Sequence, residues 1–280
     1  MRGETSSASA KEVTRQSRSN LAFSFRCLPK QTRVDMTTFY AFCRLVDDLA
    51  DEPTAPVEER RKALHRWKDI IREVQPPETE IEKATVGLLH RYPISPEHPL
   101  ELIEGMEMDL QGSTYETFLD LEGYCYRAAS VVGLVSIEIF GYQDEAAKRY
   151  AVELGHALQL TNIIRDVRED LVKEKRVYLP AEDLEQFGVR KEDLRAERET
   201  EAFRSLMRFE AERARTRYEQ AEKAFPEADR RTLIASELMR KIYSALLTKM
   251  AKDDFRVLQQ RYRLSKWEKM GHLFGSLLAR

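Results

Sequence analysis

The stretch HALQLTNIIRDVREDLVKEKRVYLP, from His156 to Pro180, combines an apolar helical pattern with an unusual run of polar residues. Counting back from Asp170 in steps of four, four and three residues gives Asp166, Asn162 and Gln159, which therefore share one face of a helix. The other faces are apolar and can pack. Each polar group in the middle of such a helix costs about 1–3 kcal/mol if it is buried without a partner. The stretch therefore predicts a packed helix that presents one polar, functional face.

A second stretch, FYAFCRLVDDLADEP from residue 39 to 53, repeats this arrangement. Counting back from Asp51 in steps of four, three and four gives Asp47, Arg44 and Tyr40 on one helical face. Like charges at i,i+4 repel by about 0.2–0.5 kcal/mol per pair. One such cluster alone would fit a solvated helix end. Two coincident aspartate pairs favour a site that binds a positive group.

The donor atoms of these two faces are all oxygens, which favours a magnesium site over a zinc site. Mg²⁺ typically uses a few carboxylates and completes its octahedron with water and substrate phosphate, and we expect Mn²⁺ to substitute for it. The histidines show no ligand spacing: His65, His90, His98, His156 and His272. The sequence therefore indicates neither a zinc site nor a histidine-based hydrolase.

Cations stand directly beside the aspartates: Arg44, Arg165, Arg168, Lys173, Lys175 and Arg176. Positive side chains would weaken a site built for a metal alone. They suit a metal that carries a diphosphate, because the remaining oxygens accept charge-assisted hydrogen bonds. The chain has no glycine-rich phosphate loop of the P-loop or dinucleotide type. We therefore expect a clamp of Mg²⁺ and arginine around a diphosphate.

The spacing of glycine and proline along the chain predicts an all-α fold. Glycine and proline are sparse, 11 and 10 in 280 residues, and they separate long periodic segments. We expect one all-α domain over residues 19–280, preceded by a flexible N-terminal segment at 1–18. The Glu-, Arg- and Ala-rich segment 190–225 is interpreted as a solvated outer helix or an antiparallel pair that carries no chemistry.

Composition narrows the possible partners and location. The chain has 46 basic and 48 acidic residues, a net charge of -2, which argues against a nucleic-acid-binding surface. Its three cysteines lie far apart, as is typical of reduced thiols in a cytoplasmic protein. No apolar stretch reaches the ~18 residues of a membrane span, so we expect at most a peripheral contact with the inner face of a membrane. Our candidate contact is KMGHLFGSLLAR at 269–280, and a packed final helix is the alternative.

In their context, these motifs resemble those of the head-to-head prenyl synthases, the squalene and phytoene synthase family. The resemblance runs from SNLAFSFRCLPKQTR at 19–33 to FRVLQQRYRLSKWEKM at 255–270, and includes IEGMEMDL at 103–110 and YCYRAASVVGL at 124–134. Its most specific part is the second aspartate motif, with QLTN before it and YLP after it. The resemblance implies an isoprenoid-synthase helical bundle with a central cavity, in which two Asp-rich helices face each other across Mg²⁺-bound diphosphate.

The resemblance also implies roles for individual residues. The metal ligands would be Asp47, Asp51, Asn162, Asp166 and Asp170, with Asp48 the weakest member of its trio. The four ligand aspartates would form the catalytic set together with Tyr124 and Tyr126, which would lie in the cavity near the cationic centre. The substrate-binding residues would be Ser19, Asn20, Tyr40, Arg44, Gln159, Asn162, Arg165, Arg176 and Tyr178.

The implied reaction is a head-to-head (1'-1) condensation of two farnesyl diphosphates to presqualene diphosphate, in a hopanoid or carotenoid pathway. Continuation to squalene or another C30 product, and the use of NADPH, stay open because the chain has no nicotinamide fingerprint. We favour the farnesyl substrate because CRLVDDLADE and GMEMDL look closer to bacterial presqualene- and squalene-forming members. Phytoene synthesis from geranylgeranyl diphosphate is the alternative.

Two further alternatives carry less weight. A non-catalytic assembly factor is disfavoured because both aspartate motifs are intact with their arginines, and a terpene cyclase is disfavoured by the QLTN and YLP context. The chain also departs from its relatives near the expected flap over the diphosphate. Arg168 stands where a glycine is usual, Asn20 and Leu21 replace a Ser-Phe pair, and the segment before Arg176 is slightly longer. These departures bear on substrate length and product.

Overall fold

The computed structural model describes residues 20–51 and 55–278, and within them every regular element is a helix. The α-helices are α2 (Asn20–Ser24), α3 (Lys30–Asp51), α4 (Val57–Ile71), α5 (Glu80–Arg91), α6 (Glu97–Gln111), α7 (Phe118–Cys125), α8 (Val131–Phe140), α9 (Ala146–Glu169), α10 (Ala181–Gln186), α11 (Lys191–Arg195), α12 (Glu201–Ala224), α13 (Ile234–Lys252) and α14 (Lys266–Leu278). Short 3₁₀ turns form η1 (Phe25–Cys27) and η4 (Glu227–Asp229), and π-helical turns form η2 (Tyr126–Ser130) and η3 (Asp170–Glu174). The predicted all-α fold is confirmed. The segment 1–18 lies outside the described residues, and the predicted domain boundaries stay a prediction.

Helix boundaries follow local chemistry. Helix α5 begins with a capping box in which Thr79 and Glu82 satisfy each other's backbone N–H groups, and Thr117 and Asp120 do the same for α7. Helix α6 ends at Gly112, whose φ of 67° is the left-handed conformation that glycine adopts most easily. These signals place the loops between the periodic segments that the sequence predicted.

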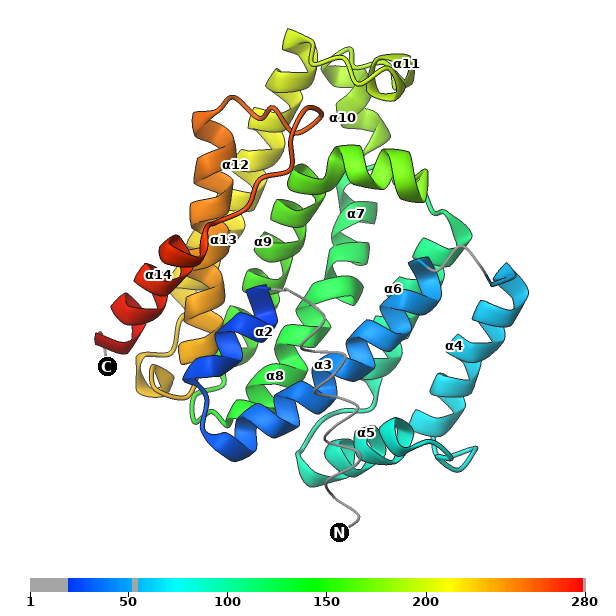
Figure 1. Ribbon diagram of the computed structural model, residues 1–280, viewed down its shortest axis with the longest axis vertical. Helices are drawn as coiled ribbons and strands as arrows, with labels where there is room; N and C mark the ends of the chain where they lie inside the picture. Colours follow the sequence, from blue (N-terminus) through cyan, green and yellow to red (C-terminus); the bar gives the residue numbers. More distant parts are fainter. Residues whose placement is uncertain (1–19, 52–54, 279–280) are drawn as a thin grey trace.

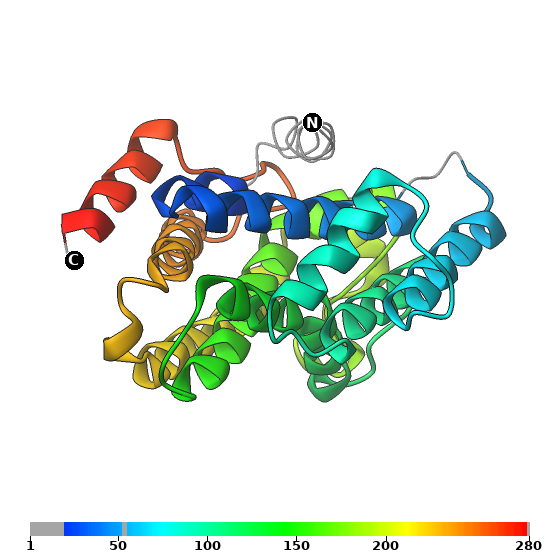
Figure 2. The same cartoon turned by 90° about the horizontal axis from the view of Figure 1, so that it is seen from below.

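Helix α9 lies in the middle of the bundle. It packs along its length against α12, and also against α8, η2 and α13 (Figure 1). Helix α3 packs against α6, α5 and α8, while α4 and α14 lie at opposite ends of the molecule (Figure 2). The two helices that carry the aspartates, α3 and α9, therefore share α8 as a neighbour, but their other main neighbours differ.

The crossing of α9 and η2 is unusually close. A Cβ atom at Gly155 would lie 2.4 Å from the Cα of Ser130, so only glycine allows this approach. Ser130 Oγ donates a hydrogen bond to the Val152 carbonyl at 2.8 Å. The contact fixes α9 against the helical segment that carries the predicted tyrosines, Tyr124 and Tyr126.

The segment 190–225 differs from its prediction. Helix α12 is not a solvated outer helix, because it packs along α9 and buries Phe203, Leu206, Met207, Ala211, Ala214, Tyr218 and Ala221. Its charged residues lie on the remaining faces, which is why the composition alone looked like a solvated helix. One of them, Glu210, is itself buried next to Arg213.

Helix α14 is packed against the bundle on one face, and two aromatic side chains are exposed on another. Leu273 and Ser276 are buried, and α14 packs against α13. Trp267 remains 85% exposed and Phe274 57% exposed. None of the described helices has the length and apolar character that a membrane span requires.

Candidate active site

The aspartates of α3 are paired with an arginine of their own helix. Arg44 Nη1 donates to Asp47 Oδ2 at 2.6 Å, and Arg44 Nη2 bonds to Asp48. These partners lie three and four residues from Arg44, so one helical face brings all three together. The side chains of Asp47 and Asp48 are 38% and 53% exposed, and water therefore reaches this cluster.

The aspartate of α9 is more deeply buried and has a distant partner as well. Arg165 holds Asp166 through two contacts, one of them Nε to Oδ1 at 2.9 Å. Arg261, from the loop after α13, reaches the same Oδ1 at 3.0 Å and also bonds Glu169 Oε2 at 2.5 Å. The Asp166 side chain is 14% exposed. Its partners therefore come from two parts of the chain.

The amides on the α9 face also lie together. Asn162 Nδ2 donates to Gln159 Oε1 at 3.3 Å, as the spacing of three residues predicts. Asn162 Oδ1 is buried and has no hydrogen-bond partner among the residues that the structure describes. A buried acceptor without a donor is costly, so this oxygen is suited to a cation or a donor from a bound molecule.

Arg176 joins the two halves. Its Nη1 donates to Asp51 Oδ1 at 2.8 Å and its Nη2 to the Ala50 carbonyl at 3.0 Å, both at the end of α3. Its own backbone N–H donates to the Asp170 carbonyl at 3.0 Å, across the π-helical turn η3. Arg176 is only 11% exposed on its side chain. The end of α3 and the end of α9 are therefore connected through one residue, whose guanidinium bonds to α3 and whose backbone N–H bonds to Asp170.

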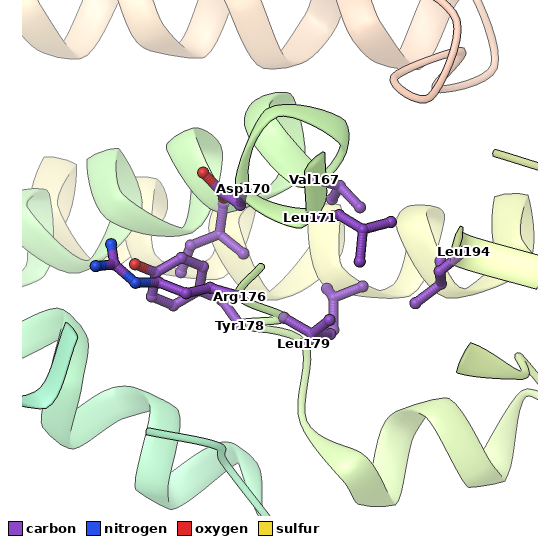
Figure 3. Close-up of a pocket in the computed structure, with 9 residues that line it drawn as sticks. Val167, Asp170, Leu171, Arg176, Tyr178, Leu179 and Leu194 are labelled. Atoms are coloured by element: carbon purple, nitrogen blue, oxygen red, sulfur yellow. The ribbon is translucent and has the colours of Figure 1, made fainter. Parts of the chain in front are cut away.

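A narrow pocket lies beside this connection. Asp170, Arg176 and Tyr178 gather at one end of it, and Leu171 and Leu194 lie at the other (Figure 3). Its interior has room for about one water molecule. The polar end of the site is thus closely packed in this arrangement.

Asp109 is a site residue that our sequence analysis did not assign. It is 7% exposed on α6 and accepts hydrogen bonds from Tyr178 at 2.7 Å and from Tyr124 at 2.9 Å. The rings of Tyr124 and Tyr178 stack with centroids 5.1 Å apart, and Tyr115 packs against both. The feature of the sequence that could have indicated Asp109 is its position on the buried face of α6, three residues after Met106.

The carboxylates of the site are crowded. Burial, with repulsion from Asp51 and against the attraction of Arg44, raises the pKa of Asp47 to about 7, although solvent contact moderates this effect. Burial and then the charges of Asp166 and Asp109 raise the pKa of Asp170 to about 8. Burial raises the pKa of Asp109 to about 6, while its tyrosine donors and Arg176 act in the opposite direction. An added cation would relieve this crowding.

The donor set fits a hard divalent cation in its chemistry, since every candidate ligand is an oxygen. The buried Asn162 Oδ1 and the raised pKa values of Asp47 and Asp170 support that fit. Within residues 20–51 and 55–278, no three acidic, histidine or cysteine side chains form a group that could hold one ion. Arginines hold Asp47, Asp51 and Asp166 instead.

The remaining predicted residues are placed as follows. Tyr40 is buried on α3 and makes an edge contact with Phe25. Asn20 begins α2, which packs against α13. The charged neighbours of Tyr126 are Glu101 and Arg127, so it does not join the tyrosines around Asp109. Ser19 lies outside the described residues.

The C-terminal region adds cations that the sequence analysis did not assign. Besides Arg261, this region carries Lys269, whose pKa is lowered by burial and then by the charges of Arg165 and Arg263. Against the effect of burial, Asp166 and Tyr243 of α13 raise the pKa of Arg165. Three cations that repel one another indicate a place where an anion is stabilised.

Comparison with known proteins identifies the family. Residues 14–268 match the squalene/phytoene synthase family. The chain belongs to that family. It is 33% identical over 267 residues to a 15-cis-phytoene synthase of Synechococcus elongatus, covering 90% of this chain and 85% of the relative. It is 34% identical over 254 residues to the chloroplastic phytoene synthase 1 of Arabidopsis thaliana, covering 87% of this chain and 59% of that longer protein.

Solved structures of squalene/phytoene synthases share the fold. A dehydrosqualene synthase superposes with a TM-score of 0.84 at 26% identity, covering 99% of this chain and 96% of the other. A squalene synthase of Alicyclobacillus acidocaldarius superposes with a TM-score of 0.80 at 29% identity, covering 90% of this chain and 95% of the other. The predicted family and the isoprenoid-synthase bundle are confirmed.

Membership of the squalene/phytoene synthase family fixes the reaction class. The chain is a prenyltransferase of the head-to-head type, and the substrates of such enzymes are prenyl diphosphates. The family uses a divalent metal to ionise the diphosphate. Family membership does not specify the length of the prenyl chain or the final product.

Proposed function

We propose that this chain condenses two molecules of farnesyl diphosphate head to head to form presqualene diphosphate. The observation that carries the proposal is the joining of two aspartate-bearing helix ends by Arg176, with further cations on both sides. Such an arrangement supplies both the oxygen ligands for a metal and the guanidinium donors for a diphosphate.

When substrate binds, we expect Arg44 and Arg176 to exchange their aspartate partners for the diphosphate. Arg44 and Arg176 now hold Asp47 and Asp51, so ion pairs maintain both arginines in position before substrate binds. Mg²⁺, when held by Asp47, Asp51, Asn162, Asp166 and Asp170, would supply the positive charge that favours loss of diphosphate from the allylic carbon. The guanidinium groups then turn from the carboxylates to the diphosphate oxygens, whose bidentate geometry they match.

The tyrosines act on the other side of the reacting carbon. Asp109 fixes the hydroxyls of Tyr124 and Tyr178, so their stacked rings have a defined orientation. The electron-rich face of such a ring stabilises a nearby cation. The double bond of the second substrate attacks the ionised carbon, and loss of one proton closes the cyclopropane. The apolar helices exclude water that would quench the cation.

Two prenyl diphosphates are candidates for the substrate. The fold of a dehydrosqualene synthase and of a squalene synthase matches nearly the whole chain, which supports a farnesyl substrate. The phytoene synthases among the relatives, at 32–35% identity, support geranylgeranyl diphosphate as the second candidate. Both diphosphates would use the same clamp. Discrimination must therefore come from the length of the apolar cavity, where each buried CH₂ contributes about 0.8 kcal/mol.

One incubation separates these candidates. Purified protein with Mg²⁺ receives farnesyl or geranylgeranyl diphosphate, with and without NADPH, and the products are identified by mass spectrometry. We expect farnesyl diphosphate to be consumed preferentially, with presqualene diphosphate accumulating when NADPH is withheld. Preferential formation of phytoene would replace the farnesyl substrate. No turnover of either would favour the non-catalytic assembly factor.

We also propose a peripheral membrane contact through α14, because substrate and product are lipidic. Trp267 and Phe274, seven residues apart, share one exposed face of this helix, with Lys266 at its start. Exposed aromatic and basic side chains on a short helix suit an interfacial position. The Trp267→Ser variant should lose most co-sedimentation with anionic liposomes and keep its turnover of dissolved substrate. Unchanged co-sedimentation would refute the contact.

A further inference from the structure

A hollow lies on the outer side of η3 and the segment that follows it to Arg176, here called the flap, and is separate from the site described above. It encloses about 370 Å³ between η3 and α11, within the range of small-molecule pockets. Its wall is apolar and consists of Leu171, Val177 and Leu194, with the exposed Val172 beside them. Helices α10 and α11 lie at the top of the molecule in Figure 1, above the ends of α9 and α7.

The apolar wall is shared with the active site. Leu171, Val177 and Leu194 also line the narrow pocket that contains Asp170, Arg176 and Tyr178. In Figure 3, Leu171 and Leu194 lie on the side of that pocket away from Arg176. One layer of side chains therefore separates the hollow from the diphosphate clamp.

Three cations surround the hollow: Lys175, Lys191 and Arg195. Lys191 and Arg195 are four residues apart, so they share one face of α11 and repel each other. Lys175 caps η3 and lines the hollow from the opposite element. In the part of the chain that the structure describes, none of the three has an acidic side chain within ion-pairing distance.

Two acids near the hollow, Asp193 and Glu197, already have other partners. Asp193 is held by Arg190 at 2.8 Å and by Arg198 at 2.7 Å, on the other side of α11. Glu197 is held by Arg168 at 2.7 Å. The positive charge at the hollow is therefore left for a ligand from solution.

We infer that this hollow binds a prenyl diphosphate outside the flap, before the molecule reaches the clamp. An apolar wall next to three cations matches an amphiphile with an apolar chain and a multiply charged anionic head. A diphosphate head carries more negative charge than the head of an ordinary acidic phospholipid, so three converging cations favour it. The inference rests on the proposed function, which requires two copies of the same amphiphile for each reaction.

The test compares charge variants in two assays. The probe is the unreactive farnesyl thiodiphosphate, titrated calorimetrically into the full chain in EDTA, where no metal assists the inner clamp. The variant Lys191→Gln/Arg195→Gln removes two cations from the hollow. Lys223→Gln/Lys252→Gln removes two exposed cations elsewhere and serves as the matched control, and Lys191→Arg/Arg195→Lys keeps the charge.

We expect the charge-removing variant to bind the probe on the order of 10-fold more weakly, and the control and charge-keeping variants to bind as wild type does. With Mg²⁺, the same variant should lose kcat/KM for farnesyl diphosphate with little change in kcat, and its kcat/KM should depend less on salt. Equal affinity of all four proteins for the probe would overturn the inference.

The source of the ligand is tested with vesicles of phosphatidylglycerol. If the charge-removing variant loses vesicle binding but keeps wild-type affinity for farnesyl thiodiphosphate, a lipid headgroup occupies the hollow and the inference is wrong. Failure of the proposed function has a different signature. The wild type would then turn over no prenyl diphosphate with Mg²⁺, whatever the binding in EDTA.

Discussion

The two aspartate-bearing helix ends have the same spacing but different environments. At the end of α3, Asp47 is 38% exposed and is paired with Arg44 of its own helix. At the end of α9, Asp166 is 14% exposed and is paired with both Arg165 and the distant Arg261. The Arg44–Asp47 pair is thus assembled by local sequence, whereas the partners of Asp166 include one that depends on the tertiary fold.

The largest effect on turnover should follow from removing the side chain that connects the ends of α3 and α9. Arg176→Ala removes the donor to Asp51 and a clamp for the leaving diphosphate. Losing one well-placed electrostatic donor in comparable sites reduces the rate about 10²–10³-fold. Turnover of farnesyl diphosphate at saturating Mg²⁺ measures this loss. A rate within a few-fold of wild type would show that the connection is not part of the clamp.

A second comparison concerns stability in the absence of metal. Asp166→Ala leaves the guanidinium of Arg165 buried without its partner, which should destabilise the protein by up to about 3 kcal/mol. Asp47→Ala removes an exposed ion pair and a repulsion of similar size, so its effect should stay within about 0.5 kcal/mol. Urea unfolding of both variants in EDTA makes the measurement. Equal losses would contradict the difference in environment.

The third predicted effect is a pH dependence. The pKa of Asp170 is raised from its ordinary value of 3.8 to about 8, so the folded state retains a proton that the unfolded state releases. Stability without metal therefore falls as pH rises from about 4 to 8. Asp170→Asn lacks this penalty and should exceed wild type at pH 8 by at least about 1 kcal/mol, since one pKa unit is worth 1.36 kcal/mol.

At pH 4 the advantage of Asp170→Asn should nearly vanish, because this pH lies only just above the ordinary pKa of 3.8, where the unfolded state begins to release its proton. Thermal melts of the two proteins in EDTA across this range provide the comparison. A constant offset at every pH would mean that the carboxylate does not titrate in the predicted window.

Much of this site could be predicted from helical spacing. The periodicity places Asp47 and Arg44 on one face of α3, and Gln159 and Asn162 on one face of α9, as the hydrogen bonds then show. Spacing alone does not reveal which groups meet across the bundle. The bonds from Arg176 to Asp51 and from Arg261 to Asp166 depend on how the chain folds back.

Two other features lay beyond the sequence analysis for physical reasons. Asp109 sits on the buried face of α6, where one acid in an apolar pattern gives little indication of the tyrosines that bind it. Helix α12 has the composition of a solvated helix, yet its small residues Ala211 and Ala214 allow it to pack along α9. The composition of a helix is an average over all its faces, whereas its packing depends on the residues of one face.

In the proposed function, the two aspartate ends act together on metal-bound diphosphate. This is tested by measuring the formation of presqualene diphosphate from farnesyl diphosphate by wild type, Asp47→Asn and Asp170→Asn, each with Mg²⁺ and with EDTA. We predict product from wild type with Mg²⁺ only, and a rate at least about 10²-fold lower from either variant. Full activity in EDTA, or wild-type rates in either variant, would contradict the account.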